Sequence, residues 1–182
     1  MSWVQLAYGE LFDFADPSVD EISIETIAHS LALQCRFSGH CRRFVSVAEH
    51  SVLTARRVAE LLPENQVAEL CALLHDASEA ILCDLPRPLK QMEIVANYRE
   101  WEAQVQSQLF TKFVGVDQPT QELKKIIKQA DNELLATEKA QNMDTPPREW
   151  VVLPDPLTIE LPFWAPEQAE QVFLGHYRRL KA

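Results

Sequence analysis

Residues 67–86 read VAELCALLHDASEAILCDLP, and this stretch indicates the fold class. Its first eight residues are apolar over more than half of a helical circumference, so the helix is expected to lie centrally. His75 and Asp76 then interrupt the apolar run. We predict one helix from about Asn65 to Leu82, ending before the loop at residues 84–88, because two nearby prolines do not fit a helix.

Helical periodicity continues on both sides of this stretch. Ser46-Val47-Ala48-Glu49 has the form of a capping box, in which the serine and the glutamate satisfy unpaired backbone N–H groups. The helix that it opens should end near Leu62, because Pro63 follows. Further helices are predicted for the stretches 23–35, 89–114, 119–141 and 166–180, and residues 3–14 alternate as in a short strand or hairpin. The fold class is therefore all-α, a bundle of five to seven helices with a short N-terminal hairpin.

The composition fits a globular chain and argues against polymer binding. The 182 residues match one domain, and only four are glycine. The net charge of −10 repels phosphate backbones, so no nucleic acid polymer is expected as a partner. A small anionic substrate is compatible with that charge when a local cation, such as a metal ion, overrides it.

We expect a cytoplasmic protein without a membrane partner. The N-terminus has no basic stretch followed by an apolar one, and no apolar run approaches the roughly 18 residues of a membrane span. The four cysteines form no C-x-x-C pair and are expected to be buried or half-buried free thiols: Cys35, Cys41, Cys71 and Cys83.

One aspartate lies where the helical pattern calls for an apolar side chain. In residues 121–140, QELKKIIKQADNELLATEKA, Asp131 follows Ile127 by four positions and precedes Leu134 by three. An unpaired carboxylate on that face would cost several kcal/mol or take up a proton, so a cation or donor network is expected beside it. Glu133 and Glu138 are expected on the polar side as solvated charges.

His50, one turn into the capped helix, and the pair His75-Asp76 are likewise polar residues at positions where the helical pattern calls for apolar side chains. Taken singly, His50 is more often a core histidine bonded to a carbonyl, and Asp131 could cap a helix or pair with an arginine. Together, two imidazoles and two carboxylates are a mixed nitrogen and oxygen set that suits a divalent ion and leaves coordination positions for substrate.

The order of these residues resembles the H…HD…D signature of the HD-domain metal-dependent phosphohydrolases. The segments VAEHS (47–51) and LLHDASEAILCDLP (73–86), with Asp131 on a later helix, are most similar to the branch of 5′-deoxynucleotidases and nucleotide triphosphohydrolases. The resemblance covers about residues 24–140 of a single HD-type domain (1–182) and leaves a C-terminal extension, residues 142–182. It implies hydrolysis of a phosphate ester of a small nucleotide, either a nucleoside 5′-monophosphate or a (deoxy)nucleoside triphosphate.

The resemblance also implies roles for individual residues. His50, His75, Asp76 and Asp131 would bind one divalent ion, whose identity (Mn, Co, Mg, Ni, Fe or Zn) the ligand types leave open. Glu79 and Asp84 would orient or deprotonate the attacking water. Glu79 lies four residues after His75 and so shares its helical face, whereas Asp84 suits a turn or capping role nearly as well.

Substrate contacts are expected from residues on both sides of the motif: Arg36, Phe37, His40, Arg87 and Lys90. Arg36 lies one residue nearer to His50 than the family pattern predicts. Phe37 stands where a tryptophan is usual, which leaves base recognition open. Arg87 and Lys90 compete for the same phosphate, and solvated surface charges are the alternative for both.

Two other functions are compatible with these residues. A hydrolase of alarmones or cyclic nucleotides is weakened because HDASEA lacks the second acid pair usual in alarmone hydrolases. A non-catalytic HD-like scaffold that binds nucleotide or protein is disfavoured because every expected ligand is present. The aromatic residues of the tail, Trp150, Phe163 and Trp164, suit either a homo-oligomer or packing against the domain.

Overall fold

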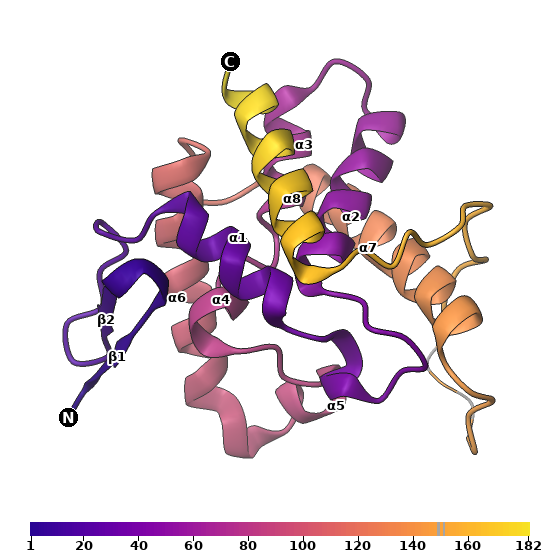
Figure 1. Cartoon of the computed structure of the whole chain (residues 1–182), viewed down its shortest axis with the longest axis horizontal. Coiled ribbons are helices and arrows are strands. Elements are labelled where there is room, and N and C mark those ends of the chain that lie inside the picture. Colours follow the sequence, from indigo (N-terminus) through magenta and orange to yellow (C-terminus); the bar gives the residue numbers. More distant parts are fainter. Residues whose placement is uncertain (149, 151) are drawn as a thin grey trace.

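The computed structural model describes residues 1–148, 150 and 152–182. These residues form eight α-helices and one two-stranded hairpin (Figure 1). The helices are α1 (Ile24–Leu33), α2 (Val47–Leu61), α3 (Gln66–Leu73), α4 (Glu79–Leu82), α5 (Arg87–Lys90), α6 (Ala96–Phe113), α7 (Gln121–Asn142) and α8 (Pro166–Lys181). Because α4 and α5 are single turns of four residues, six longer helices make up the bundle, as predicted.

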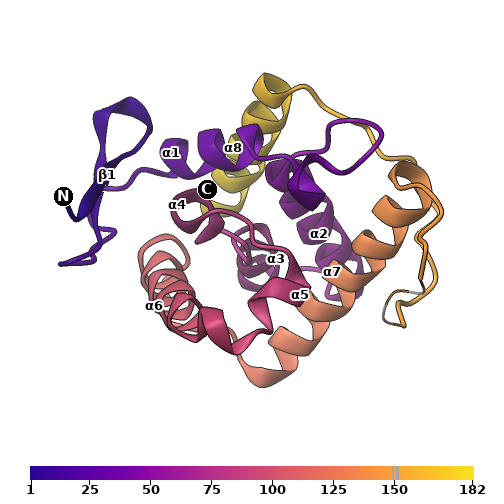
Figure 2. The ribbon, with the colours of Figure 1, turned by 90° about the horizontal axis from the view of Figure 1, so that it is seen from below.

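The centre of the bundle is α2. It packs against α3, α7, α8 and α1, and α7 runs alongside it (Figure 2). The C-terminal α8 lies across α1, α2 and α3, so this last helix and the first three long helices share one core. Phe173 of α8, Leu31 of α1 and Leu73 of α3 are all fully buried there. Because α2 is surrounded on several sides, polar side chains in its first half, such as His50, are removed from solvent.

The N-terminal hairpin pairs β1 (Trp3–Gln5) with β2 (Leu11–Asp13) in antiparallel register, which confirms that prediction. It projects beside α1 at the edge of the bundle (Figure 1). Phe12 is its one fully buried side chain and anchors it to the core.

Two predicted helices are interrupted in the structure. The helix expected from Asn65 to Leu82 ends at Leu73, and α4 begins only at Glu79. The helix expected from Leu89 begins at Ala96, after the single turn α5 and a 3-10 turn, Glu93–Val95. Side-chain periodicity does not register the first break, because the residues on both sides of it keep apolar side chains toward the core. In the second stretch, the residues before Ala96 bury no side chain, so they lie outside the core-facing helix.

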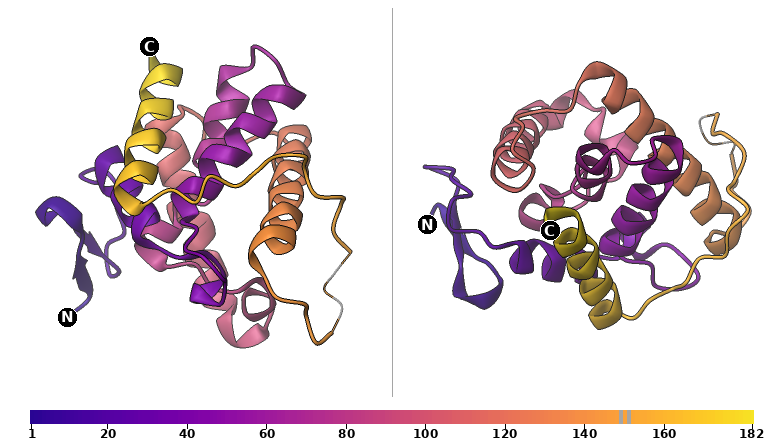
Figure 3. Two further views of the ribbon diagram at one scale, coloured as in Figure 1. Left: turned by 45° about the vertical axis from the view of Figure 1, so that its right-hand side comes forward. Right: turned by 90° about the horizontal axis from the view of Figure 1, so that it is seen from above.

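The segment before α8 crosses the outside of α7 (Figure 3). Thr137 and Gln141 of α7 bind its backbone, with Leu157 N 2.9 Å from Thr137 Oγ1 and Leu161 N 3.0 Å from Gln141 Oε1. Phe163 and Trp164 pack against the core clusters, so the alternative of packing on the domain holds for both.

The cap of α2 is formed in part as predicted. Ser46 Oγ accepts from Glu49 N at 3.0 Å, but the fully buried Glu49 carboxylate binds the N–H groups of Phe163 and Trp164 instead of returning to Ser46. Burial raises the pKa of Glu49 to about 7, against these two donors. Glu49 therefore ties the C-terminal segment to α2.

The structure also bears on the expectations for the cysteines and for membrane-spanning helices. The four cysteines are free, but Cys83 is exposed rather than buried, because it lies past the end of α4 with its backbone in the left-handed region at φ 68°. None of the described helices has the length and apolar character needed to cross a bilayer.

Candidate metal centre

The break between α3 and α4 brings His75 and Asp76 to one place. The last turn of α3 closes with Leu74, and the backbone then turns so that Ala77 N bonds Leu74 O at 3.1 Å. Gln106 of α6 bridges the break, donating to Leu74 O at 2.7 Å and accepting from Ser78 N at 2.9 Å. Because the helix stops here, two consecutive side chains need not diverge by the roughly 100° of a regular helix. His75 Nε2 and Asp76 Oδ2 lie 3.2 Å apart.

His50 reaches the same place from one turn inside the start of α2. Its side chain is fully buried, and Nδ1 donates to Glu138 Oε1 at 2.8 Å. The Nε2 atom faces Asp131 Oδ1 at 3.3 Å, with Thr54 Oγ1 at 3.4 Å. A carboxylate on Nδ1 fixes the ring and leaves Nε2 as the atom directed at the site.

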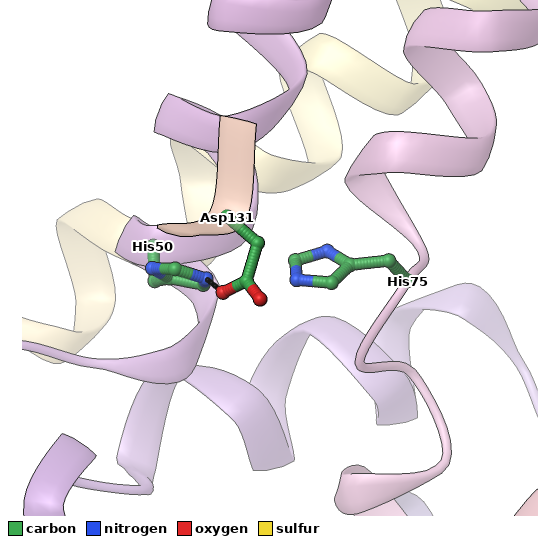
Figure 4. A group of neighbouring side chains, drawn as sticks. All are labelled: His50, His75 and Asp131. Carbon is green, nitrogen blue, oxygen red and sulfur yellow. Dashed lines mark ion pairs between the residues drawn. The ribbon is translucent and has the colours of Figure 1, made fainter. Parts of the chain in front are cut away.

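Asp131 extends from α7 between the two histidines. Figure 4 shows its carboxylate between the imidazole rings of His50 and His75, with the ion pair to His50 dashed. One ligand atom from each of the three residues lies within 4.8 Å of the other two. Asp131 Oδ2 also accepts from Lys128 Nζ at 2.6 Å and from Arg87 at 3.2 Å.

The donor set fits a divalent cation. His75 Nδ1 donates to Ala72 O at 2.7 Å, so its Nε2 is the acceptor nitrogen when the ring is neutral. That buried Nε2 receives no hydrogen bond from any described residue. Ligands around an ion at about 2.1 Å stand roughly 3–4 Å apart, and the three ligand atoms here lie within 4.8 Å of one another. Both histidines thus have Nδ1 bound by protein and Nε2 turned inward, the arrangement typical of metal-ligating histidines.

The electrostatics of the site favour positive charge. Burial opposes charging of His75, but Asp76 and Asp131 outweigh it and raise its pKa to about 9. Burial and Arg36 oppose charging of His50, whose pKa is nevertheless raised because Glu138 and Asp131 lie against it. Burial works against ionised Asp131, yet the two histidines and Lys128 hold its pKa far below the usual range. A cation bound here would take the place of these protons.

A second acidic group lies beside the cluster. Glu79 at the start of α4 is buried, and its Oε1 accepts from Lys90 Nζ at 2.8 Å, while Lys90 also bonds Glu102 at 2.6 Å. Burial, followed by the charges of Asp76 and Asp84, raises the pKa of Glu79 to about 8, although Lys90 opposes the shift. Glu79 can therefore hold or release a proton near neutral pH, as a general acid or base must.

The predicted substrate contacts lie in different environments. Arg36 is buried, with Nε bonded to Glu138 Oε2 at 2.8 Å. Lys90 is paired with two glutamates, so it is not the solvated surface charge given as its alternative. Phe37 is half-buried beside Trp150, with ring centroids 6.2 Å apart. His40 is exposed. Arg87 reaches the centre directly through Asp131.

The expectation that Glu133 and Glu138 are solvated charges was wrong. Glu138 is fully buried between His50 and Arg36, and Glu133 is 8% exposed and bonds Arg57 at 2.6 Å. The signal was present in the spacing, because Glu138 follows Asp131 by seven residues, which is two helical turns along the same face. Gln106, which bridges the helix break, had no comparable signal because its partners are backbone atoms.

Similarity to known proteins identifies the family of the chain. No family model matches the chain. The uncharacterised protein YfdR of Escherichia coli K12 is 36% identical over 139 residues, which cover 76% of this chain and 71% of YfdR. A 5′-deoxynucleotidase of Vibrio vulnificus, VV1113, is 31% identical over 130 residues, covering 63% of this chain and 56% of that protein. The chain belongs to the HD-domain family.

A third relative of this HD-domain protein is an uncharacterised protein of Rhodobacter capsulatus. It is 39% identical over 92 residues, covering 49% of this chain. The alignments span about half the length of the R. capsulatus and V. vulnificus relatives, at 47% and 56%. The family resemblance read from the HD motif is therefore confirmed, and within this HD-domain protein His50, His75 and Asp131 form a group able to hold a metal ion.

Proposed function

We propose that this HD-domain protein is a metal-dependent phosphohydrolase that cleaves a phosphate ester of a small nucleotide. The observation on which the proposal depends is the convergence of His50, His75 and Asp131 with both histidine Nδ1 atoms already bonded to protein. The name of the V. vulnificus relative, a 5′-deoxynucleotidase, supports a nucleotide as the substrate class.

Asp76 completes the proposed ligand set. Its carboxylate lies 3.2 Å from His75 Nε2, the nitrogen that would face the ion, and His75 holds its pKa low against the effect of burial. When bound, a divalent cation supplies Lewis acidity toward a water molecule and a phosphoryl oxygen. Mn, Co, Mg, Ni, Fe and Zn all suit nitrogen and oxygen ligands of this kind.

Residues around the ligands provide proton transfer and charge. Glu79, with Asp84 nearby, is proposed to orient the attacking water and accept its proton, and Lys90 fixes the Glu79 carboxylate for that task. Arg87 and Arg36 are proposed to face the phosphate, with Phe37 and His40 toward the rest of the nucleotide. Each cation in contact with phosphate stabilises charge that moves onto its oxygens during hydrolysis.

The test is an activity screen of the purified chain. Each of the six metals is combined with nucleoside 5′-monophosphates, (deoxy)nucleoside triphosphates, cyclic nucleotides and guanosine tetraphosphate, and release of phosphate, triphosphate or nucleoside is measured. We expect turnover with a monophosphate or a triphosphate that is lost on chelation and in the Asp131→Asn variant. Hydrolysis only of cyclic nucleotides or the tetraphosphate would change the substrate class. Metal binding without turnover of any substrate would contradict the enzyme and favour a scaffold.

A further inference from the structure

Two cysteines lie in contact beside the candidate metal centre. Cys35 and Cys41 flank the 3-10 turn Arg36–Gly39, and their Sγ atoms are 3.7 Å apart. Both side chains are half-buried, so a small oxidant can reach them. The Cys41 thiol also donates to Arg43 O at 3.1 Å, which keeps it on the inner side of the loop.

The backbone holds the two thiols together. Phe37, Ser38 and Gly39 have φ of 58°, 52° and 79°, and this run in the left-handed region folds the loop back on itself. At one end, Cys35 forms a β-bridge with Ser46. At the other end, Arg42 N bonds Asn142 O at 2.9 Å. The contact between the sulfurs is thus a consequence of fixed loop ends.

The same loop leads directly to His50. Arg36, the neighbour of Cys35, bonds Glu138 Oε2 at 2.8 Å, and Glu138 Oε1 accepts from His50 Nδ1 at 2.8 Å. A change in the path of residues 35–41 therefore acts on the carboxylate that orients a candidate metal ligand. Outer contacts of this kind influence metal affinity by about 10–100-fold.

We propose that Cys35 and Cys41 form a reversible disulfide when a hydroperoxide is present, and that this disulfide weakens metal binding at His50. The part concerning the metal rests on the proposed function. The Cys35 thiolate attacks one peroxide oxygen and breaks the O–O bond, which leaves a sulfenic acid and releases water or an alcohol. Cys41 then attacks the Cys35 sulfur, so that the S–S bond forms and water leaves. The two thiols lose two electrons and two protons in total, and a dithiol reverses the reaction.

The order of the two steps follows from the surroundings of Cys41. Burial and the adjacent Cys35 thiol raise the pKa of Cys41 to about 11, so Cys41 acts second, as the resolving thiol. Closing a 3.7 Å contact to a bond of about 2.05 Å requires a shift of roughly 1.6 Å shared between the two sides of the loop. Arg36 is next to one of the moving residues and is displaced relative to Glu138.

The experiment oxidises the metal-free full chain with hydrogen peroxide in the presence of a chelator and then removes both reagents. Free thiols are counted after denaturation, the disulfide is located by peptide mapping, and Mn²⁺ affinity is measured by calorimetry before and after dithiothreitol. Cys83→Ser is the matched control, because it removes the exposed thiol and keeps the pair.

We expect wild type and Cys83→Ser to lose two thiols as a Cys35–Cys41 crosslink and to bind Mn²⁺ about tenfold more weakly until reduced. Cys35→Ser and Cys41→Ser should form no such crosslink and keep their affinity under the same treatment. Absence of the crosslink, or a crosslink with unchanged affinity, would overturn the proposal. A reduced protein that binds no Mn²⁺ at all would instead count against the proposed function, while the mapped crosslink would still decide whether the thiols are paired.

Discussion

The two histidines of the candidate metal centre belong to differently built parts of the molecule. His50 lies within the regular helix α2, fully buried, and a carboxylate on α7 holds its ring. His75 lies where α3 has ended, and the backbone carbonyl of Ala72, three residues earlier, holds its ring. Both rings present Nε2 to Asp131.

The difference shows two ways to orient a ligand. Around His50 the orientation depends on a side chain from a distant part of the chain, so it exists only once α2 and α7 are packed together. Around His75 it depends on a local interruption of the helix, which Gln106 holds open from α6. A side-chain partner can be changed without disturbing the backbone, whereas the break depends on backbone hydrogen bonds.

The largest effect is expected at the residue that both histidines share. Asp131→Asn removes the charge between the rings, so metal affinity should fall by more than about 100-fold, beyond the loss typical of outer contacts. Calorimetric titration with Mn²⁺ measures the change. Asp117→Asn, at an exposed carboxylate, is the control and should bind as wild type does. Equal affinity of the two variants would show that Asp131 is no ligand.

The metal-free protein should lose stability as the pH rises. The folded pKa of His75 is about 9, above its ordinary value of 6.5, so the folded state binds a proton more tightly than the unfolded state. The resulting stabilisation is complete below pH 6.5 and disappears as the pH rises through about 9, on the order of 3 kcal/mol.

Denaturant titrations at about pH 6 and about pH 9.5, in the presence of a chelator, measure this change. His75→Gln should remove the His75 share of the change and leave the share of Glu79, whose raised pKa of about 8 lies in the same range. A wild-type stability that is constant across this range would contradict the charged pairing of His75 with Asp76 and Asp131.

A smaller loss should follow when the support of His50 is weakened. Glu138→Gln keeps the shape of the side chain but removes the charge that polarises Nδ1, so metal affinity should fall by about 10–100-fold with the fold intact. Glu122→Gln on the exposed start of α7 is the matched control. Unchanged affinity in the Glu138 variant would mean that the ring is oriented by packing alone.

The corresponding change on the His75 side is Gln106→Leu. It leaves Leu74 O and Ser78 N without their side-chain partner, which should cost about 1.5 kcal/mol in the free energy of unfolding. Chemical denaturation measures it against Gln104→Leu, an exposed position on the same helix. A loss no greater than that of the control would show that the helix break holds without α6.

The smallest effect is expected at the start of α2. Ser46→Ala removes the hydroxyl that accepts from Glu49 N, which should cost about 1 kcal/mol of stability. Metal affinity should stay nearly unchanged, since His50 lies a full turn inside the helix. Ser46→Thr should restore most of the stability. If metal affinity fell as well, the orientation of His50 would depend on the helix end and not on Glu138 alone.

Much of the fold and the centre of the site could be predicted from local pattern. Ser46 correctly marked the start of α2, and Asp131 stood out because a carboxylate occupied an apolar face. Glu138 shares that face but is charged, and its burial depends on Arg36 and His50, which come from distant parts of the sequence. The break after Leu73 was missed because helical periodicity continues through it.

By itself, the sequence determined the helical class, the boundaries marked by Ser46 and the prolines, and the family, since these depend on neighbouring residues and on a short motif. Only the tertiary structure decided that Glu138 binds His50, that Glu49 binds the C-terminal segment, and that Cys35 touches Cys41. Those contacts join residues through folded loops and packed helices, and their energies depend on burial, which no local stretch of sequence specifies.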